Sequence, residues 1–356
     1  MALLLADAQA SPKADPPVRP VPGVADRSLE SEKAVREFGE SSKTVGMTVA
    51  VVRDGQLLYR GRYGFENLED RVETSEETIM RYASVSKPIT ATAIMRLADS
   101  GRIDIDLPIR RYVPAWPAHH APLTTRQILA HLSGIRHYRA GKNDNSGRYY
   151  PSLAEALRVF QNDDLVSRPG SRYLYSTHAY TLAGAALEQA SGSDFRSAIR
   201  SMLSEAAPSI DVEVRSQSKA RRAAIYGLTR DGTPVRIPSD AVEDNSWKYP
   251  GGGLEGTAVD LARFGDAVYR ARIVSAAGRD AMWTAQRDAD GRSTGYGLGW
   301  RIGTDTVSHG GSQQGARSSL LIDRRDGTVV AVLTNTDIAV RPSTLAEQLM
   351  RIWGRR

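Results

Sequence analysis

The order of the predicted elements constrains the fold more than any other feature of the sequence. β-rich runs lie near both ends, over residues 46–65 and 296–334. Asp54-Gly55 predicts a hairpin turn in the first run and Asp326-Gly327 a turn in the second. The middle of the chain has mainly helical apolar spacing. We therefore expect an α+β fold, with an antiparallel sheet built from both chain ends, flanked by helices, and an inserted, mostly helical lobe.

These boundaries give one domain over residues 24–356. The sheet lobe should take about 24–80 and 255–356, and the helical lobe about 81–254. Before it, Ala8-Gln9-Ala10 resembles an export cleavage site, and a proline-rich stretch follows. We expect residues 1–23 to be a signal remnant with a linker, or a cloning scar. A periplasmic or secreted bacterial protein is the first expectation, and a cytoplasmic one the alternative.

Composition excludes several classes of function. No apolar run approaches 18 residues, so we expect no transmembrane segment. The net charge of +6 is dispersed and no nucleic-acid motif is present, so we expect no nucleic-acid partner. The absence of cysteine excludes disulfides, thiolate metal sites and a cysteine nucleophile. The six histidines show no ligand spacing. We expect no metal and no cofactor.

Ser84 and Lys87 form an S-x-x-K pattern at a predicted helix start, with Pro88 in the first turn. Residues three apart share a helix face, so the amine can reach the hydroxyl. A serine hydroxyl is a weak nucleophile until a neighbouring base activates it. Alone, the pattern also fits a serine-capped helix with a solvated lysine. It needs further motifs downstream.

Tyr175, in Leu174-Tyr175-Ser176, precedes another predicted helix. It is either a packed aromatic with a bonded hydroxyl or a base beside Ser84. In the second case the Lys87 cation should lower the pKa of the phenol.

His309, Gly310, Gly311 and Ser312 precede a predicted strand. They are either a tight turn or a segment whose glycines let the backbone approach a substrate. In the second case the Ser312 N–H joins the Ser84 N–H in an oxyanion hole, and His309 points toward substrate or tyrosine.

In the order S-x-x-K, Y-S-x, H-G-G, these motifs resemble those of the serine β-lactamase and penicillin-binding family, on its class C-like branch. Segments 131–138, 160–177 and 244–253 are similar to those of the mitochondrial serine β-lactamase-like proteins. The resemblance runs from about residue 45 to the C-terminus. It implies a β-lactamase/transpeptidase-like fold, Ser84 as acylated nucleophile, Lys87 and Tyr175 as the proton-transfer pair, and His309 in the third-motif position.

Two positions depart from the family pattern. Thr177 replaces an asparagine that contacts substrate, and His309 replaces the usual β-lactamase lysine. Trp247 and Tyr249 either line the substrate site or only pack. Segment 131–134 is expected to shape the helical lobe without a catalytic role.

We therefore expect a serine hydrolase that cleaves amide or ester bonds through an acyl-enzyme. Tyr175, assisted by Lys87, would take the Ser84 proton. A small peptide or ester is the expected partner, with weak or no β-lactamase activity. The alternative is a structural protein that keeps the fold for ligand binding or for assembly into homo-oligomers or filaments, as the resemblance implies.

Overall fold

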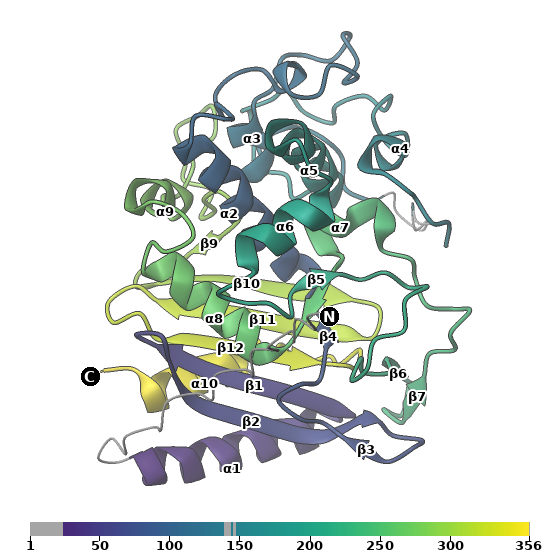
Figure 1. The fold of residues 1–356 in the computed structure, drawn as a ribbon, viewed down its shortest axis with the longest axis vertical. Coiled ribbons are helices and arrows are strands. Elements are labelled where there is room, and N and C mark those ends of the chain that lie inside the picture. The colour runs from purple at the N-terminus through teal and green to yellow at the C-terminus, as the bar shows by residue number, and fades with distance from the viewer. Residues whose placement is uncertain (1–23, 139–143, 145–146, 356) are drawn as a thin grey trace, which may run out of the picture.

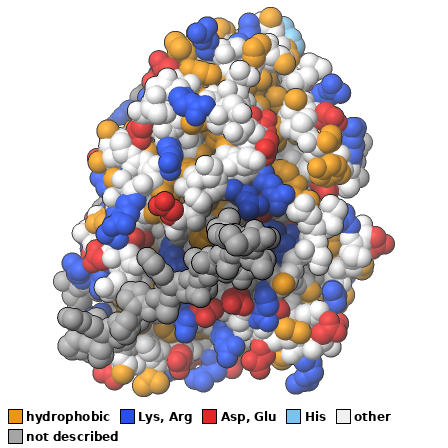
Figure 2. All heavy atoms as spheres, viewed as in Figure 1, with side chains coloured by type: hydrophobic (Ala, Val, Ile, Leu, Met, Phe, Trp, Pro, Cys, Tyr) orange, Lys and Arg blue, Asp and Glu red, His pale blue; other side chains and the backbone are white. Residues whose placement is uncertain are grey.

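The computed structural model describes residues 24–138, 144 and 147–355. Predictions made for the signal-like segment and the proline-rich stretch lie outside these residues. No helix of the described ranges is long and apolar enough to cross a bilayer. Basic and acidic side chains are interspersed over the face shown in Figure 2.

The sheet is antiparallel and is built from both chain ends, as the order of elements predicted (Figure 1). Its strand order is β3-β2-β1-β12-β11-β10-β9, so the first and last long strands, β1 and β12, are neighbours at its centre. The seven strands are β1 (Gly46–Arg53), β2 (Gln56–Asn67), β3 (Val72–Glu73), β9 (Arg301–Ile302), β10 (Thr306–Gln313), β11 (Ala316–Asp323) and β12 (Val329–Thr334).

Helices cover both faces of this sheet. The terminal helices α1 (Val24–Ser42) and α10 (Ser343–Trp353) pack on one face, and α1 runs along the bottom of Figure 1. The opposite face carries α8 (Ala258–Tyr269). Side chains alternate along a strand, so β1 sends Val49 and Val51 to the first layer and Ala50 and Val52 to the second. Buried on both faces, β1 therefore reads as a continuous apolar run.

The remaining helices form a lobe above the sheet. Its helical elements are η1 (Ala83–Val85), α2 (Ser86–Asp99), η2 (Ile109–Arg111), α3 (Thr125–Leu129), α4 (Leu153–Leu157), α5 (Thr177–Ser191), α6 (Phe195–Leu203), η3 (Ser246–Lys248), α7 (Tyr249–Gly252) and α9 (Ala276–Met282). A small sheet of β4 (Met80–Arg81), β8 (Leu254–Gly256) and β5 (Asp211–Val212) and a hairpin of β6 (Tyr226–Leu228) and β7 (Pro234–Arg236) complete the fold.

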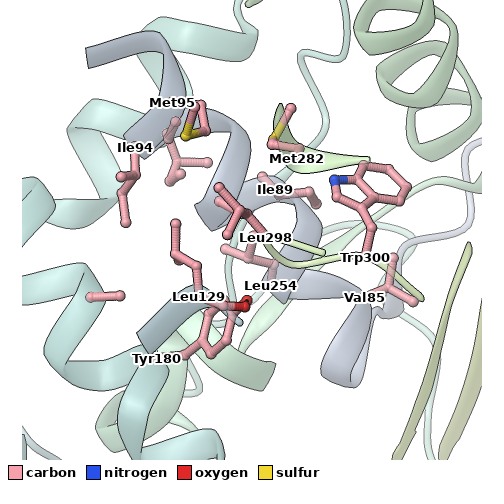
Figure 3. Packing of buried hydrophobic residues seen from close by; sticks show 14 of the residues in the cluster. Val85, Ile89, Ile94, Met95, Leu129, Tyr180, Leu254, Met282, Leu298 and Trp300 are labelled. Carbon is pink, nitrogen blue, oxygen red and sulfur yellow. The ribbon is translucent and has the colours of Figure 1, made fainter. Parts of the chain in front are cut away.

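Helix α2 is the centre of the larger core. All residues from 86 to 95 are buried. In Figure 3, Ile89 and Ile94 lie among side chains from other elements, including Leu129 and Trp300. A helix enclosed in this way cannot shift without disturbing several neighbours. Its first turn is therefore held firmly against the sheet.

Two local predictions were wrong. Within the second β-rich run the sequence predicts a strand over 296–302, but only 301–302 belong to β9, because Gly297 packs tightly against the Met282 carbonyl. The sequence Pro250-Gly251-Gly252-Gly253 predicts a glycine-rich loop, but its first three residues lie in the short helix α7. Of the two alternatives left open for segment 308–312, the structure excludes the turn, since β10 continues through it in register with β11 to Gln313.

Candidate active site

Ser84 lies in the short helix η1, between the sheet and the helical lobe, where η1 contacts β10, β11 and α7. Ser84 is partly exposed, whereas the residues on either side of it are buried. The preceding Ala83 has a φ of +48°, which is uncommon for a residue with a side chain. The Tyr82 carbonyl accepts hydrogen bonds from the Val85 N–H (3.1 Å) and the Ser318 hydroxyl (2.6 Å). The surroundings thus hold a strained turn that presents the serine.

Lys87 lies in the first turn of α2, and its side chain is fully buried. Its Nζ is 3.3 Å from Ser84 Oγ, 3.2 Å from Thr177 Oγ1 and 2.6 Å from the Gly251 carbonyl oxygen. Burial, together with the nearby Lys248, holds the pKa of the amine well below its ordinary value. A neutral amine has two N–H groups and one lone pair. It can donate to Thr177 and Gly251 and accept from Ser84.

Tyr175 lies just before α5, and its hydroxyl hydrogen-bonds to the Ser84 side chain. Its ring centroid is 4.7 Å from Lys87 Nζ. Burial raises the pKa of this phenol above its ordinary value, although the bond to Ser84 works in the opposite direction. The sequence analysis expected Lys87 to lower this pKa. The structure differs because both groups are buried, and burial favours the neutral phenol and the neutral amine.

Strand β10 lies close to η1 at Gly311. A Cβ built on Gly311 would lie 2.4 Å from the Tyr82 carbonyl oxygen and 3.0 Å from Ala83 Cβ. Gly310 is exposed, a Cβ built on it would meet only the Ser318 carbonyl oxygen, at 3.8 Å, and Ser312 is exposed on the same strand. The H-G-G-S segment therefore runs beside the turn that carries the nucleophile.

His309 is buried and both of its ring nitrogens are bonded. Nδ1 is 2.8 Å from the Gly310 carbonyl oxygen, to which it must donate, so Nε2 accepts from the Tyr296 hydroxyl at 2.9 Å. Burial, with help from Lys87, lowers the pKa of His309 to about 3. We expected this ring to point toward substrate or Tyr175. Instead its contacts support β10 from within.

Most of the other residues that were expected to contact substrate make contacts within the protein instead. The Thr177 hydroxyl is held by Lys87, and the residue is buried. Trp247 is only 1% exposed and packs against Tyr138 and His178. Tyr249, at the start of α7, is partly exposed.

Three further residues that were not predicted from the sequence lie at this site: His131, His137 and Lys248. The rings of His131 and His137 lie 4.3 and 5.4 Å from that of Tyr175. Lys248 is buried, 3.6 Å from the Glu243 carboxylate, and its charge acts on Lys87. His131 belongs to a segment that we had expected only to shape the helical lobe. No residue spacing marks these three positions.

Within the described ranges, no three histidine or carboxylate side chains gather as a metal site would require. The chemistry that this arrangement can perform is nucleophilic attack by Ser84. An amine of lowered pKa and a phenol of raised pKa lie in hydrogen-bond contact with its hydroxyl.

The comparisons with known proteins agree with this geometry. Residues 32–352 match the model of the family described as Beta-lactamase. The human mitochondrial serine beta-lactamase-like protein LACTB is 28% identical over 312 residues, covering 68% of this chain and 56% of its own length. The chain thus spans little more than half of that relative. Esterase EstB of Burkholderia gladioli is 29% identical, covering 86% of this chain and 88% of its own.

Solved structures show the same fold. The octameric penicillin-binding protein homologue from Pyrococcus abyssi has a TM-score of 0.77 at 24% identity, covering 92% of this chain and 78% of its own. The D-stereospecific amidohydrolase from Streptomyces sp. has a TM-score of 0.74 at 21% identity, covering 92% of this chain and 99% of its own. With the family match extending over most of its length, this chain belongs to the beta-lactamase family of serine hydrolases.

Proposed function

We propose that this serine hydrolase cleaves small esters or amides through an acyl-enzyme on Ser84. One observation carries the assignment. The fully buried Lys87 amine lies 3.3 Å from Ser84 Oγ and, among the described residues, is paired with no carboxylate. A lysine of lowered pKa beside a serine hydroxyl is a general base.

The pKa directions favour Lys87 as the first proton acceptor. Ser84 Oγ attacks the substrate carbonyl carbon while its proton moves to Lys87 Nζ. The neutral Tyr175 hydroxyl then protonates the leaving group and recovers a proton from Lys87. In the second half, water attacks the acyl carbon and gives a proton to the same pair. The bond between the acyl carbon and Ser84 Oγ then breaks, the acid product leaves, and the pair returns the proton to Ser84 Oγ. Tyr175 thus acts as donor and relay, since its raised pKa disfavours a resting phenolate.

Backbone N–H groups supply the oxyanion hole in the proposed mechanism. We assign the oxyanion hole to the N–H groups of Ser84 and Ser312, because β10 passes beside η1 at Gly311. Donors fixed in place stabilise the charge that develops on the carbonyl oxygen and need no reorganisation. His309 supports β10 through its bonds to Tyr296 and the Gly310 carbonyl, and so acts on the hole indirectly.

Relatives of different kinds support the proposed substrate class. One relative is named an esterase and a structural neighbour is titled an amidohydrolase. We propose an esterase-type or peptidase-type activity with weak or no β-lactam hydrolysis. The third motif carries a neutral histidine where a β-lactamase usually has a cationic lysine.

Assembly is a second candidate role. A structural neighbour is described as octameric, which supports testing the chain for homo-oligomers or filaments. Electron microscopy and light scattering across ionic strengths would detect such assemblies. Monomers under every condition would rule out this role without affecting the hydrolase. Export to a periplasm or medium also remains our proposal, and fractionation of expressing cells tests it.

Intact-mass spectrometry after incubation with a fluorophosphonate tests the hydrolase proposal. Wild-type protein should gain one adduct and Ser84→Ala none. Ser133→Ala is a matched control, because the one hydrogen bond of its hydroxyl among the described residues is accepted from the nearby Ile135 N–H, and it should label like wild type. Folded wild-type protein that gains no adduct would overturn the proposal. Ester, peptide and chromogenic cephalosporin substrates then separate the three activities.

A further inference from the structure

Two histidines hold the chain on the C-terminal side of Tyr175. His131 Nδ1 accepts the Ser176 N–H at 3.2 Å, and His137 Nδ1 accepts the next N–H, that of Thr177, also at 3.2 Å. These N–H groups stand at the start of α5, where backbone donors have no partner within the helix. The histidines come from a different segment, about 40 residues earlier in the chain.

His131 holds this segment on both sides of the tyrosine. Its carbonyl oxygen accepts the Leu174 N–H at 2.7 Å, while its ring accepts the Ser176 N–H. A φ of +58° at His131 lets its backbone and side chain face the same segment. Its ring is fully buried and lies 4.3 Å from the Tyr175 ring. Tyr175 is therefore fixed at both neighbouring residues and along one side of its ring.

His137 also contacts the Tyr175 ring. Its ring meets that of Tyr175 edge-on, at 5.4 Å and 90°, and stacks on Tyr138 at 3.9 Å. Arg136 Nη1 donates to the His137 carbonyl oxygen at 2.9 Å and fixes the backbone there. Burial lowers the pKa of both histidines, that of His137 to about 4. Each ring is thus neutral, with Nδ1 free to accept and its proton on Nε2.

We propose that His131 and His137 are positioning residues that hold the Tyr175 hydroxyl at the nucleophile. This inference rests on the proposed function, because it concerns the tyrosine that serves Ser84. Neither imidazole contacts Ser84 in a hydrogen bond among the described residues, so both act through Tyr175. The Ser176 hydroxyl caps α5 by accepting a different N–H, that of Ala179, at 3.0 Å, so the histidines bond two donors that this cap does not reach.

The test compares two substitutions at each histidine. His131→Asn and His137→Asn keep an acceptor near the position of Nδ1, and asparagine tolerates the positive φ at 131. His131→Leu and His137→Leu remove the acceptor. We expect the leucine variants to lose about tenfold to a hundredfold in the rate of fluorophosphonate labelling, the scale of a misplacement of about 1 Å. The asparagine variants should stay within a few-fold of wild type.

A double-mutant cycle separates positioning from general stability. In a Tyr175→Phe background the hydroxyl is absent, so His137→Leu should cause no further loss of labelling rate. His120→Leu is the matched control. His120 is also buried, but its ring contacts Trp116 and the Gln161 carbonyl, so labelling should keep the wild-type rate even if the melting temperature falls.

The outcomes are distinct. Wild type that fails to label overturns the proposed function and this inference with it. If wild type labels and the leucine variants label at the same rate as wild type, the inference is overturned and the proposed function stands. The same conclusion follows if the losses in the double-mutant cycle are fully additive. If His131→Leu fails to fold, the His137 pair and its cycle decide the question.

Discussion

Gly311→Ala is the sharpest test of how β10 and the nucleophile's turn fit together. A Cβ at this position would lie 2.1 Å from Ser318 Oγ, 2.4 Å from the Tyr82 carbonyl oxygen and 3.0 Å from Ala83 Cβ. Ordinary carbon contacts begin near 3.5 Å. The Tyr82 oxygen belongs to the backbone, so an added methyl group must push β10 and η1 apart.

The size of the effect follows from this overlap. Overpacking of a well-packed interior costs about 1–3 kcal/mol of unfolding free energy. A shift of about 1 Å between catalytic groups costs on the order of a hundredfold in rate. We expect Gly311→Ala to lower the unfolding free energy by about 1–3 kcal/mol. We also expect it to slow fluorophosphonate labelling by about two orders of magnitude in protein that is still folded.

Urea titration and time-resolved intact-mass spectrometry measure these two quantities. Gly310→Ala is the control for stability, because the nearest atom to its Cβ would be the Ser318 carbonyl oxygen at 3.8 Å. Its unfolding free energy should stay within about 0.5 kcal/mol of wild type. If Gly311→Ala matched wild type in both stability and labelling rate, the close approach of β10 to η1 would not determine the site's geometry.

Three other predictions follow from charges in the site. Lys87→Met should lower the labelling rate by about 10² or more. In wild type, the labelling rate should fall with decreasing pH only near the lowered pKa of Lys87, and a pH–rate profile measures this fall. In the folded protein the pKa values of His137 and His309 are about 4 and about 3, below the ordinary 6.5. Between each folded pKa and 6.5 the unfolded chain binds more protons than the folded one, so the unfolding free energy falls as pH drops below about 6.5. Each histidine changes the unfolding free energy by up to about 1.4 kcal/mol per pH unit. Urea midpoints measured from about pH 7 to 4 should therefore fall less steeply with pH in His309→Gln than in wild type. Arg301 on β9 is exposed, acts electrostatically on Tyr175 and has no carboxylate partner among the described residues. Arg301→Gln should therefore lower kcat/KM for an ester of a dicarboxylic acid more than for its neutral analogue. Equal losses for the two esters would show that Arg301 does not select for substrate charge.

The fold was predictable where the signals are local. Asp54 and Gly55 have φ values of +53° and +76°, the backbone that an Asp-Gly hairpin turn favours, so the first hairpin could be placed from two residues. The strand predicted over 296–302 failed for the opposite reason. Gly297 and Gly299 serve close contacts with the Met282 carbonyl and the Ala91 side chain, which come from other parts of the chain.

The candidate site divides in the same way. Ser84 and Lys87 are three residues apart on one helical turn, so their proximity follows from helix geometry. The contacts of His131 with Ser176 depend on how two distant segments pack, and no spacing encodes them. The direction of the Tyr175 pKa shift also escaped the sequence, because it depends on the depth of burial.

The two buried lysines show why one can serve as a base. Lys248 is 3.6 Å from Glu243, whose charge raises the lysine pKa against the effect of burial. Both causes that act on Lys87, burial and the charge of Lys248, lower its pKa. Its carbonyl and hydroxyl partners satisfy the two N–H groups of a neutral amine without stabilising a full charge as a carboxylate would. The difference in partners, at similar burial, supports the proposal that Lys87, and not Lys248, is the base for Ser84.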